Sequence, residues 1–186
     1  MAMMEPTTRT QYDNLHAQDG DVRYAALNYI LSATEQRVDW AYEVWDDLLV
    51  HLQHKNNHQR AIAAQVLCNL AKSDPEQRML HDFATLLAVT KDDKFVTARH
   101  CLQALWKVGV AGAQQQQIVV DGLAGRFIEC VAEKNDSLIR YDIIQGLKQL
   151  YDQVKNEGIR ARALALIAME QAEKYRKKYA SVWKVR

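Results

Sequence analysis

The chain has 186 residues, of which 48% are hydrophobic and 25% charged, and its net charge is +1. This length suits one domain that can bury a core without a metal or a disulfide. Two prolines and seven glycines are too few for the many turns of a β-sandwich or barrel. The near-neutral charge excludes a strong attraction of the whole molecule to nucleic acid or to a membrane.

Hydrophobic residues recur with helical spacing along nearly the whole chain, and no segment alternates with period two, so we expect an all-α fold. The clearest stripe runs from Val38 through Trp45 to Leu52 along one helical face. In chain order, helices are expected near 10–18, 21–33, 37–53, 57–72, 75–89, 94–108, 114–132 and 136–153, with a last long helix from 158 to about 179. At "SDPE", Ser73 or Asp74 is expected to cap a helix whose first residue is Pro75.

An arginine recurs in the first turn of every second helix. The positions, which lie 37, 39 and 41 residues apart, are Arg23, Arg60, Arg99 and Arg140. A helix pair recurring near forty residues predicts an α-solenoid, because each pair must bury its apolar stripe against its neighbours. We expect these arginines to link successive pairs through backbone carbonyls or an aspartate, with Asp21 and Asp136 as candidate partners; contact with a ligand is the alternative.

The stretch "DGDVRYAAL" at 19–27 resembles the first helix of a HEAT repeat, in which an Asp, a Val-Arg pair and spaced Ala and Leu recur. The resemblance covers 19–172 as four repeats, although the third, "KFVTARHCLQALWKV", lacks the Val-Arg pair. Armadillo units are close relatives and stay an open alternative. The resemblance implies a curved stack whose second helices line the inner face, and it implies no activity. Most members are binding scaffolds; some are DNA glycosylases of the alkylation-repair type, and some relatives are bilin lyases.

These observations predict a fold of about four HEAT-like helix pairs. We expect an N-terminal segment at 1–18, with a possible short helix, and a single HEAT-like repeat domain at 19–186 that ends in a basic helix. No apolar run has the length of a signal peptide or a membrane span. The three cysteines, Cys68, Cys101 and Cys130, lie in apolar helical patterns and are expected to be free, buried thiols. We therefore expect a cytoplasmic protein.

Catalytic and cofactor motifs are missing from the sequence. It contains no glycine-rich phosphate loop, no G-x-S-x-G and no H-E-x-x-H, and no nucleophile has a base at a recognisable spacing, so we expect no enzyme and no cofactor. His51 and His54 are one helical turn apart and could share a metal ion. Because "KNN" breaks the helix before His58 and no cysteine is near, we expect solvated or capping histidines and no metal site.

The second helices supply the predicted partner-binding surface. One row beside the core stripe holds Trp40, Val44, Asp47 and His51, and an aromatic residue beside an acid is typical of an interaction hot spot. The alternative is that both rows form one wide buried face. Matching rows in later helices contribute Arg78, His81 and Arg126. We predict that these residues bind a helix or an extended segment of another protein through the concave face.

The C-terminal stretch from 169 to 186 has a net charge of +4, which leaves −3 for 1–168. Its bases are Lys174, Arg176, Lys177, Lys178, Lys184 and Arg186, with Tyr175, Tyr179 and Trp183 between them. This patch is expected to close the solenoid as a solvated face, with weak, non-specific nucleic-acid binding as a further possibility.

The sequence thus favours a non-catalytic scaffold or adaptor that binds another protein. The alternative is a nucleic-acid-binding solenoid resembling the alkylation-repair glycosylases, for which Trp40, Asp47 and Trp106 supply the residue types. The negative balance of 1–168 argues against phosphate binding by that part of the chain.

Overall fold

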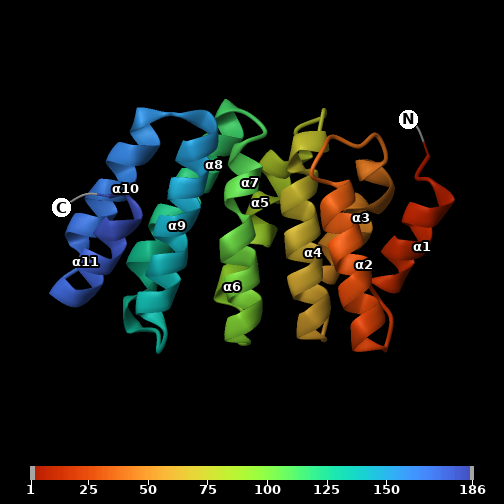
Figure 1. Cartoon of the computed structure of the whole chain (residues 1–186), viewed down its shortest axis with the longest axis horizontal. Coiled ribbons are helices and arrows are strands. Elements are labelled where there is room, and N and C mark those ends of the chain that lie inside the picture. Colours follow the sequence, from red (N-terminus) through yellow and green to blue (C-terminus); the bar gives the residue numbers. More distant parts are fainter. Residues whose placement is uncertain (1–2, 185–186) are drawn as a thin grey trace. The chain divides into compact units, whose positions relative to one another are not determined.

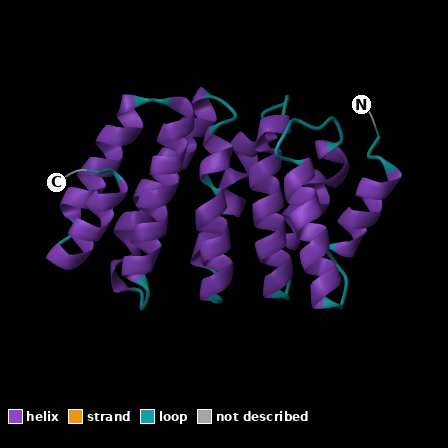
Figure 2. Ribbon diagram, in the orientation of Figure 1, coloured by secondary structure: helices purple, strands orange, loops and turns teal. Residues whose placement is uncertain are grey.

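The computed structural model describes residues 3–184, which are helical and contain no strand (Figure 2). The α-helices are α1 (Pro6–Asn14), α2 (Gly20–Ala33), α3 (Ala41–His51), α4 (Asn57–Leu70), α5 (Arg78–Ala88), α6 (Phe95–Ala104), α7 (Trp106–Gly109), α8 (Ala113–Glu129), α9 (Asp136–Val154), α10 (Glu157–Met169) and α11 (Glu173–Val182). Three short 3-10 turns follow α4, α5 and α8: η1 (Ala71–Ser73), η2 (Val89–Lys91) and η3 (Cys130–Ala132). The predicted all-α class is confirmed.

The chain divides into two compact units within α6. Unit 1 ends at Cys101, and unit 2 begins at Leu102. In unit 1, α2 packs on α1 and α4, while α3 packs on α4 and α5 (Figure 1). In unit 2, α9 packs on α7, α8, α10 and α11. No helix among residues 3–184 has the length and apolar character needed to cross a bilayer.

Arg23 and Arg60 occupy the same place at the start of α2 and α4. The N–H of Arg23 bonds to the carbonyl of Asp19, and the N–H of Arg60 bonds to that of Asn56. The side chains of Asp19 and Asn56 also cap these helices. Each Arg Nη1 then donates to a carbonyl six residues back, at 2.7 Å to Ala17 and at 2.8 Å to His54. The two arginines therefore fasten the turn that precedes their own helix.

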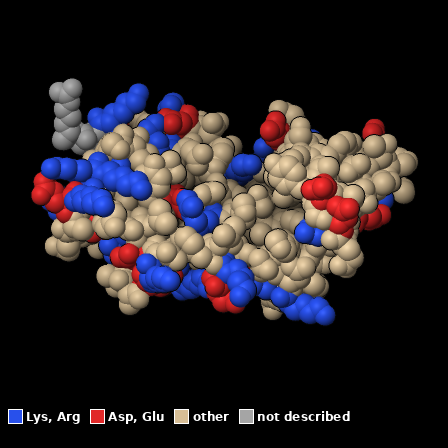
Figure 3. All heavy atoms as spheres, turned by 60° about the horizontal axis from the view of Figure 1, so that its bottom comes forward, with Lys and Arg blue, Asp and Glu red and all other residues tan. Residues whose placement is uncertain are grey.

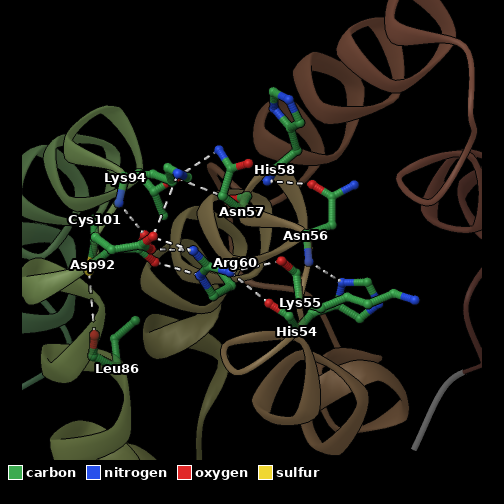
Figure 4. Close-up of polar contacts among 12 residues, drawn as sticks. His54, Lys55, Asn56, Asn57, His58, Arg60, Leu86, Asp92, Lys94 and Cys101 are labelled. Atoms are coloured by element: carbon green, nitrogen blue, oxygen red, sulfur yellow. Dashed lines mark hydrogen bonds and ion pairs between the residues drawn. The ribbon is translucent and has the colours of Figure 1, made fainter.

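Arg60 also joins α4 to the segment before α6 (Figure 4). Its Nε and Nη2 donate to Asp92 Oδ2 and Oδ1 at 2.5 and 2.8 Å. The Asp92 carboxylate also accepts from the Lys94 N–H at 2.8 Å. Burial opposes ionisation of Asp92, but the Arg60 fork and this N–H outweigh it and lower the pKa of Asp92. The aspartate that meets Arg60 is thus Asp92.

Neither candidate partner, Asp21 or Asp136, fills that role. The Asp21 N–H bonds to the side chain of Asp19, and the Asp136 carboxylate accepts from the N–H of Ser137. Both lie in the first turn of their helix, where a carboxylate meets free backbone N–H groups.

The other two recurring arginines lie one residue later in their helices. The residues that bond to the capping carbonyl are Ala98 in α6 and Ile139 in α9. Arg99 and Arg140 are therefore turned by about 100° from the place of Arg23 and Arg60. Arg140 instead pairs with Glu170 at 2.8 Å.

Arg176, which the recurrence did not include, occupies the same position at the start of α11 as Arg23 in α2 and Arg60 in α4. Its N–H bonds to the capping carbonyl of Ala172, and its Nη1 donates to the carbonyl of Glu170, six residues back, at 3.0 Å. The sequence does not identify it, because residues 158 to about 179 are predicted to form one helix, so no helix start is expected before Arg176.

Several predicted helix boundaries are wrong: α1 begins at Pro6 rather than near 10, and α3 begins at Ala41 rather than near 37. Pro75 is not the first residue of α5: that helix begins at Arg78, after Gln77 with a φ of 56°. Asp74 caps it as expected, accepting from the N–H groups of Arg78 and Met79 at 2.9 and 2.8 Å. The expected long C-terminal helix is two helices, because Glu170 has extended backbone and its carboxylate bonds to Arg140 and to the Ala172 N–H.

The cysteines are buried thiols that form no disulfide, as predicted. The Cys101 thiol donates to the carbonyl of Leu86 at 3.4 Å. Burial raises the pKa of Cys101 and of Cys130, so these thiols remain protonated and weakly nucleophilic.

Candidate functional site: the α3 surface and its histidine cluster

The exposed row of α3 is acidic and is rotated from the predicted one. Asp46 and Val50 of α3 are exposed, as is Asp39 in the turn before the helix, and Glu43 is half-buried. Asp46 has 79% of its side chain exposed. Glu43, Asp46 and Val50 follow helical spacing and so share one face of α3. We call this face, together with Asp39, the acidic edge.

One residue of the predicted α3 row, Val44, is buried and not exposed. It is 1% exposed and lies in the core of unit 1, so it cannot contact a partner. The predicted alternative, in which the two rows merge into one buried face, holds at this position. Trp40 is half-buried at the N-terminal end of α3, and Asp47 and His51 lie on the border of the acidic edge.

Arg78 of α5 is held against α3. Its guanidinium pairs with Asp46 and lies 5.3 Å from the ring centre of Tyr42 and 5.7 Å from that of Trp45. Burial opposes the charge, but the Asp46 pair outweighs it and raises the pKa of Arg78. Arg78 therefore covers the aromatic seam between α3 and α5 and neutralises part of the acidic edge.

The same seam contains partly buried polar contacts. The Trp45 indole N–H donates to Asp82 Oδ2 at 2.9 Å, and the Tyr42 hydroxyl donates to Asp74. Burial, together with the Asp74 hydrogen bond, raises the pKa of Tyr42 to about 12. The predicted residue His81 lies next to Asp82 with 95% of its side chain exposed, so it is free to meet a partner.

Arg126, the predicted contact on α8, is 2% exposed. Its Nη1 and Nη2 donate to the Glu133 carboxylate at 2.6 and 2.8 Å. This fork holds the end of α8 against the loop that precedes α9, so the prediction that Arg126 binds a partner is wrong. A buried guanidinium needs such a partner, which fixes the residue in a structural role.

Asp47 is the centre of a cluster that joins α3 to the turn after α1. The Tyr12 hydroxyl of α1 donates to Asp47 Oδ2 at 2.6 Å. His16, which follows α1, places Nε2 at 3.9 Å from the same oxygen. His51 Nδ1 donates to the backbone carbonyl of Asp47 at 2.8 Å and lies 3.4 Å from Asp47 Oδ1. The two imidazole rings have centroids 4.5 Å apart. The sequence contained a partial signal, since Asp47 and His51 are four residues apart on one helix, but the separation of His16 hid the rest.

The other histidines of this region are engaged differently. The His54 ring stacks on His51 with centroids 5.5 Å apart, and its Nδ1 accepts from the N–H of Asn56 at 3.0 Å (Figure 4). His58 is exposed. His51 thus faces His16 and Asp47, whereas His54 bonds to the backbone of Asn56, the residue that caps α4.

The two units carry opposite charge. Unit 1 has ten Lys and Arg and fourteen Asp and Glu, a net charge of −4, whereas unit 2 has fourteen and nine, a net charge of +5. In the face shown in Figure 3, basic side chains gather around the C-terminal helices.

The C-terminal bases that the structure describes are exposed, but two of the aromatic residues between them are buried. Its exposed members among the described residues are Lys174, Arg176, Lys177, Lys178 and Lys184, and Arg186 lies outside the described residues. Tyr179 and Trp183 are buried, and the Tyr179 hydroxyl donates to the carbonyl of Ser137 at 2.9 Å. These two rings belong to the core of unit 2, so they cannot stack on nucleic-acid bases.

The chain matches no protein-family model, and a search of curated proteins also gives no match. Functional inference therefore depends on the geometry described above.

Proposed function

We propose that this chain is a non-catalytic adaptor of HEAT-like helix pairs, and that the acidic edge of α3 binds a basic helix or extended segment of another protein. The observation that carries the proposal is the exposed row Asp39, Asp46 and Val50, beside the half-buried Trp40. Exposed carboxylates provide charge complementarity to the lysines and arginines of a partner. The apolar residue among them adds a small apolar surface that binding removes from water.

The recurring Arg geometry supports the HEAT-like part of the proposal. Arg23 and Arg60 lie 37 residues apart and bond to equivalent backbone carbonyls, as expected when one structural unit follows another. Arg60 also pairs with Asp92, which lies in the segment before α6, the first helix of the next pair. Such links stiffen neighbouring pairs and so present a pre-organised surface, which lowers the entropic cost of binding.

The test is quantitative affinity capture from the native source with the full chain and two charge variants. Asp39→Lys with Asp46→Lys reverses the acidic edge, and Asp21→Lys is the control, because Asp21 is exposed on α2. We expect the double variant to lose partners that the wild type and the control both retain, and we expect capture to weaken with added salt. Equal capture by all three proteins would refute the acidic edge as the binding surface.

The alternative function, nucleic-acid binding, rests on α11. Lys174, Lys177 and Lys178 are exposed there and belong to the unit with net charge +5. Tyr179 and Trp183 are buried and Tyr175 is half-buried, so phosphate contact with little base stacking is expected, which gives weak and non-specific binding.

A further inference from the structure

Three metal-ligating side chains converge where the turn after α1 meets α3. They are His16, Asp47 and His51, and one ligand atom of each lies within 4.8 Å of the other two. A zinc-type ion with bonds of about 2.0–2.2 Å holds its ligand atoms roughly 3–4 Å apart. We propose that these three residues bind a divalent first-row transition-metal ion, with Zn²⁺ as the reference case.

The hydrogen bonds around His16 fix its tautomer. Gln59 is buried, and its Nε2 donates to the carbonyl of Leu15 at 3.0 Å, which orients the amide. Gln59 Oε1 therefore faces His16 Nδ1, at 2.8 Å, and this nitrogen must carry the proton. The neutral ring then has its lone pair on Nε2, the atom that faces Asp47.

This arrangement leaves two acceptors opposite each other. His16 Nε2 and Asp47 Oδ2 are 3.9 Å apart, and neither can donate when the imidazole is neutral. A cation between them removes the repulsion and satisfies both. A histidine that donates its remote N–H to a carbonyl oxygen and offers its other nitrogen to the ion is also the usual arrangement in metal sites.

A hydrogen bond from a buried side chain also positions the Asp47 carboxylate. Tyr12 is buried, and its hydroxyl donates to Asp47 Oδ2 at 2.6 Å. Burial, with the hydrogen bond to Asp47, raises the pKa of Tyr12, so the phenol remains a donor. Tyr12 and Gln59 thus act as positioning residues for the carboxylate and for the imidazole of His16.

The donor set selects the class of ion. Two imidazoles and one carboxylate suit Zn²⁺, Co²⁺, Ni²⁺ or Cu²⁺, whereas Mg²⁺ and Ca²⁺ prefer oxygen ligands alone. Asp47 has 47% of its side chain exposed and His16 has 35%, so an ion can enter from solvent. Three protein ligands leave at least one coordination position open to water. This inference revises the sequence-based expectation of no metal site and stands independently of the proposed function.

The test is calorimetric titration of the tag-free, chelator-treated full chain with Zn²⁺ at about pH 8, where an ordinary imidazole is neutral. Co²⁺ absorption spectra report whether imidazoles coordinate the ion. We expect one ion per chain in the wild type. His16→Ala and Asp47→Asn should abolish measurable binding, and Gln59→Leu should weaken it about 10–100-fold.

The matched control is His81→Ala, which removes an exposed histidine that is not part of the cluster and should bind like the wild type. Circular dichroism establishes that each variant is folded before its affinity is compared. No binding by the wild type would overturn the proposal. Binding that survives in folded His16→Ala but is lost in His54→Ala with His58→Ala would overturn it too, because the ion would then be held by the other histidines.

Discussion

Replacing Trp45 by alanine should lower the free energy of unfolding by about 3–5 kcal/mol. The indole is 0% exposed and packs edge-to-face on Tyr42 with centroids 5.7 Å apart. Truncation opens a cavity between α3 and α5, and it leaves Asp82 without the indole donor at 2.9 Å. The lost hydrogen bond adds about 1–3 kcal/mol if Asp82 stays dry, so the upper half of the range is expected.

Trp45→Phe separates these contributions. It retains most of the apolar volume but loses the N–H, so its cost should be nearer the hydrogen-bond value, about 1–3 kcal/mol. His81→Ala is the surface control and should change stability by no more than about 0.5 kcal/mol, since the side chain is 95% exposed. His54→Ala should cost slightly more than this control, because His54 Nδ1 accepts from the Asn56 N–H.

The assay is urea unfolding followed by far-UV circular dichroism, which does not depend on the fluorescence of the residue that is changed. The two compact units can unfold separately, so the transition is fitted with and without an intermediate. Equal losses for Trp45→Ala and His81→Ala would refute the assignment of the buried face of α3.

Four further predictions rest on the contacts described. Arg60→Ala should cost about 2–4 kcal/mol at neutral pH, because it leaves Asp92 nearly buried without its partner; a double-mutant cycle with Asp92→Asn measures the pair. The folded-state pKa of Asp92 is lowered, so this contribution is fully present above the range in which an unfolded aspartate titrates, about pH 4, and is lost as the pH falls through the folded value; pH-dependent urea melts of wild type and double variant check the sign. Duplex DNA should bind weakly, and Lys174→Glu with Lys177→Glu should reduce both the affinity and its salt slope in a fluorescence titration; sub-micromolar binding that survives would favour the glycosylase-like alternative. The three cysteines are buried, so a thiol reagent should label none of them in native protein and all three in urea, by mass spectrometry.

Local patterns in the sequence predicted much of the helical structure. The stripe through Trp45 identified the buried side of α3, and the polar breaks located most loops. The Arg23 and Arg60 positions were predictable because each arginine bonds to carbonyls only six residues back. Helical periodicity and capping depend on residues a few positions apart, so the sequence alone carries that information.

Tertiary packing decided the rest. Val44 is buried because α3 packs against neighbours on more than one side, a breadth that a single helical stripe does not specify. The break at Glu170 depends on Arg140, thirty positions earlier, and the partner of Arg60 lies 32 positions later. His16 meets Asp47 and His51 only once α1 lies beside α3. Such contacts follow from which helices pack together, which is set by burial over the whole unit, so no local spacing in the sequence encodes them.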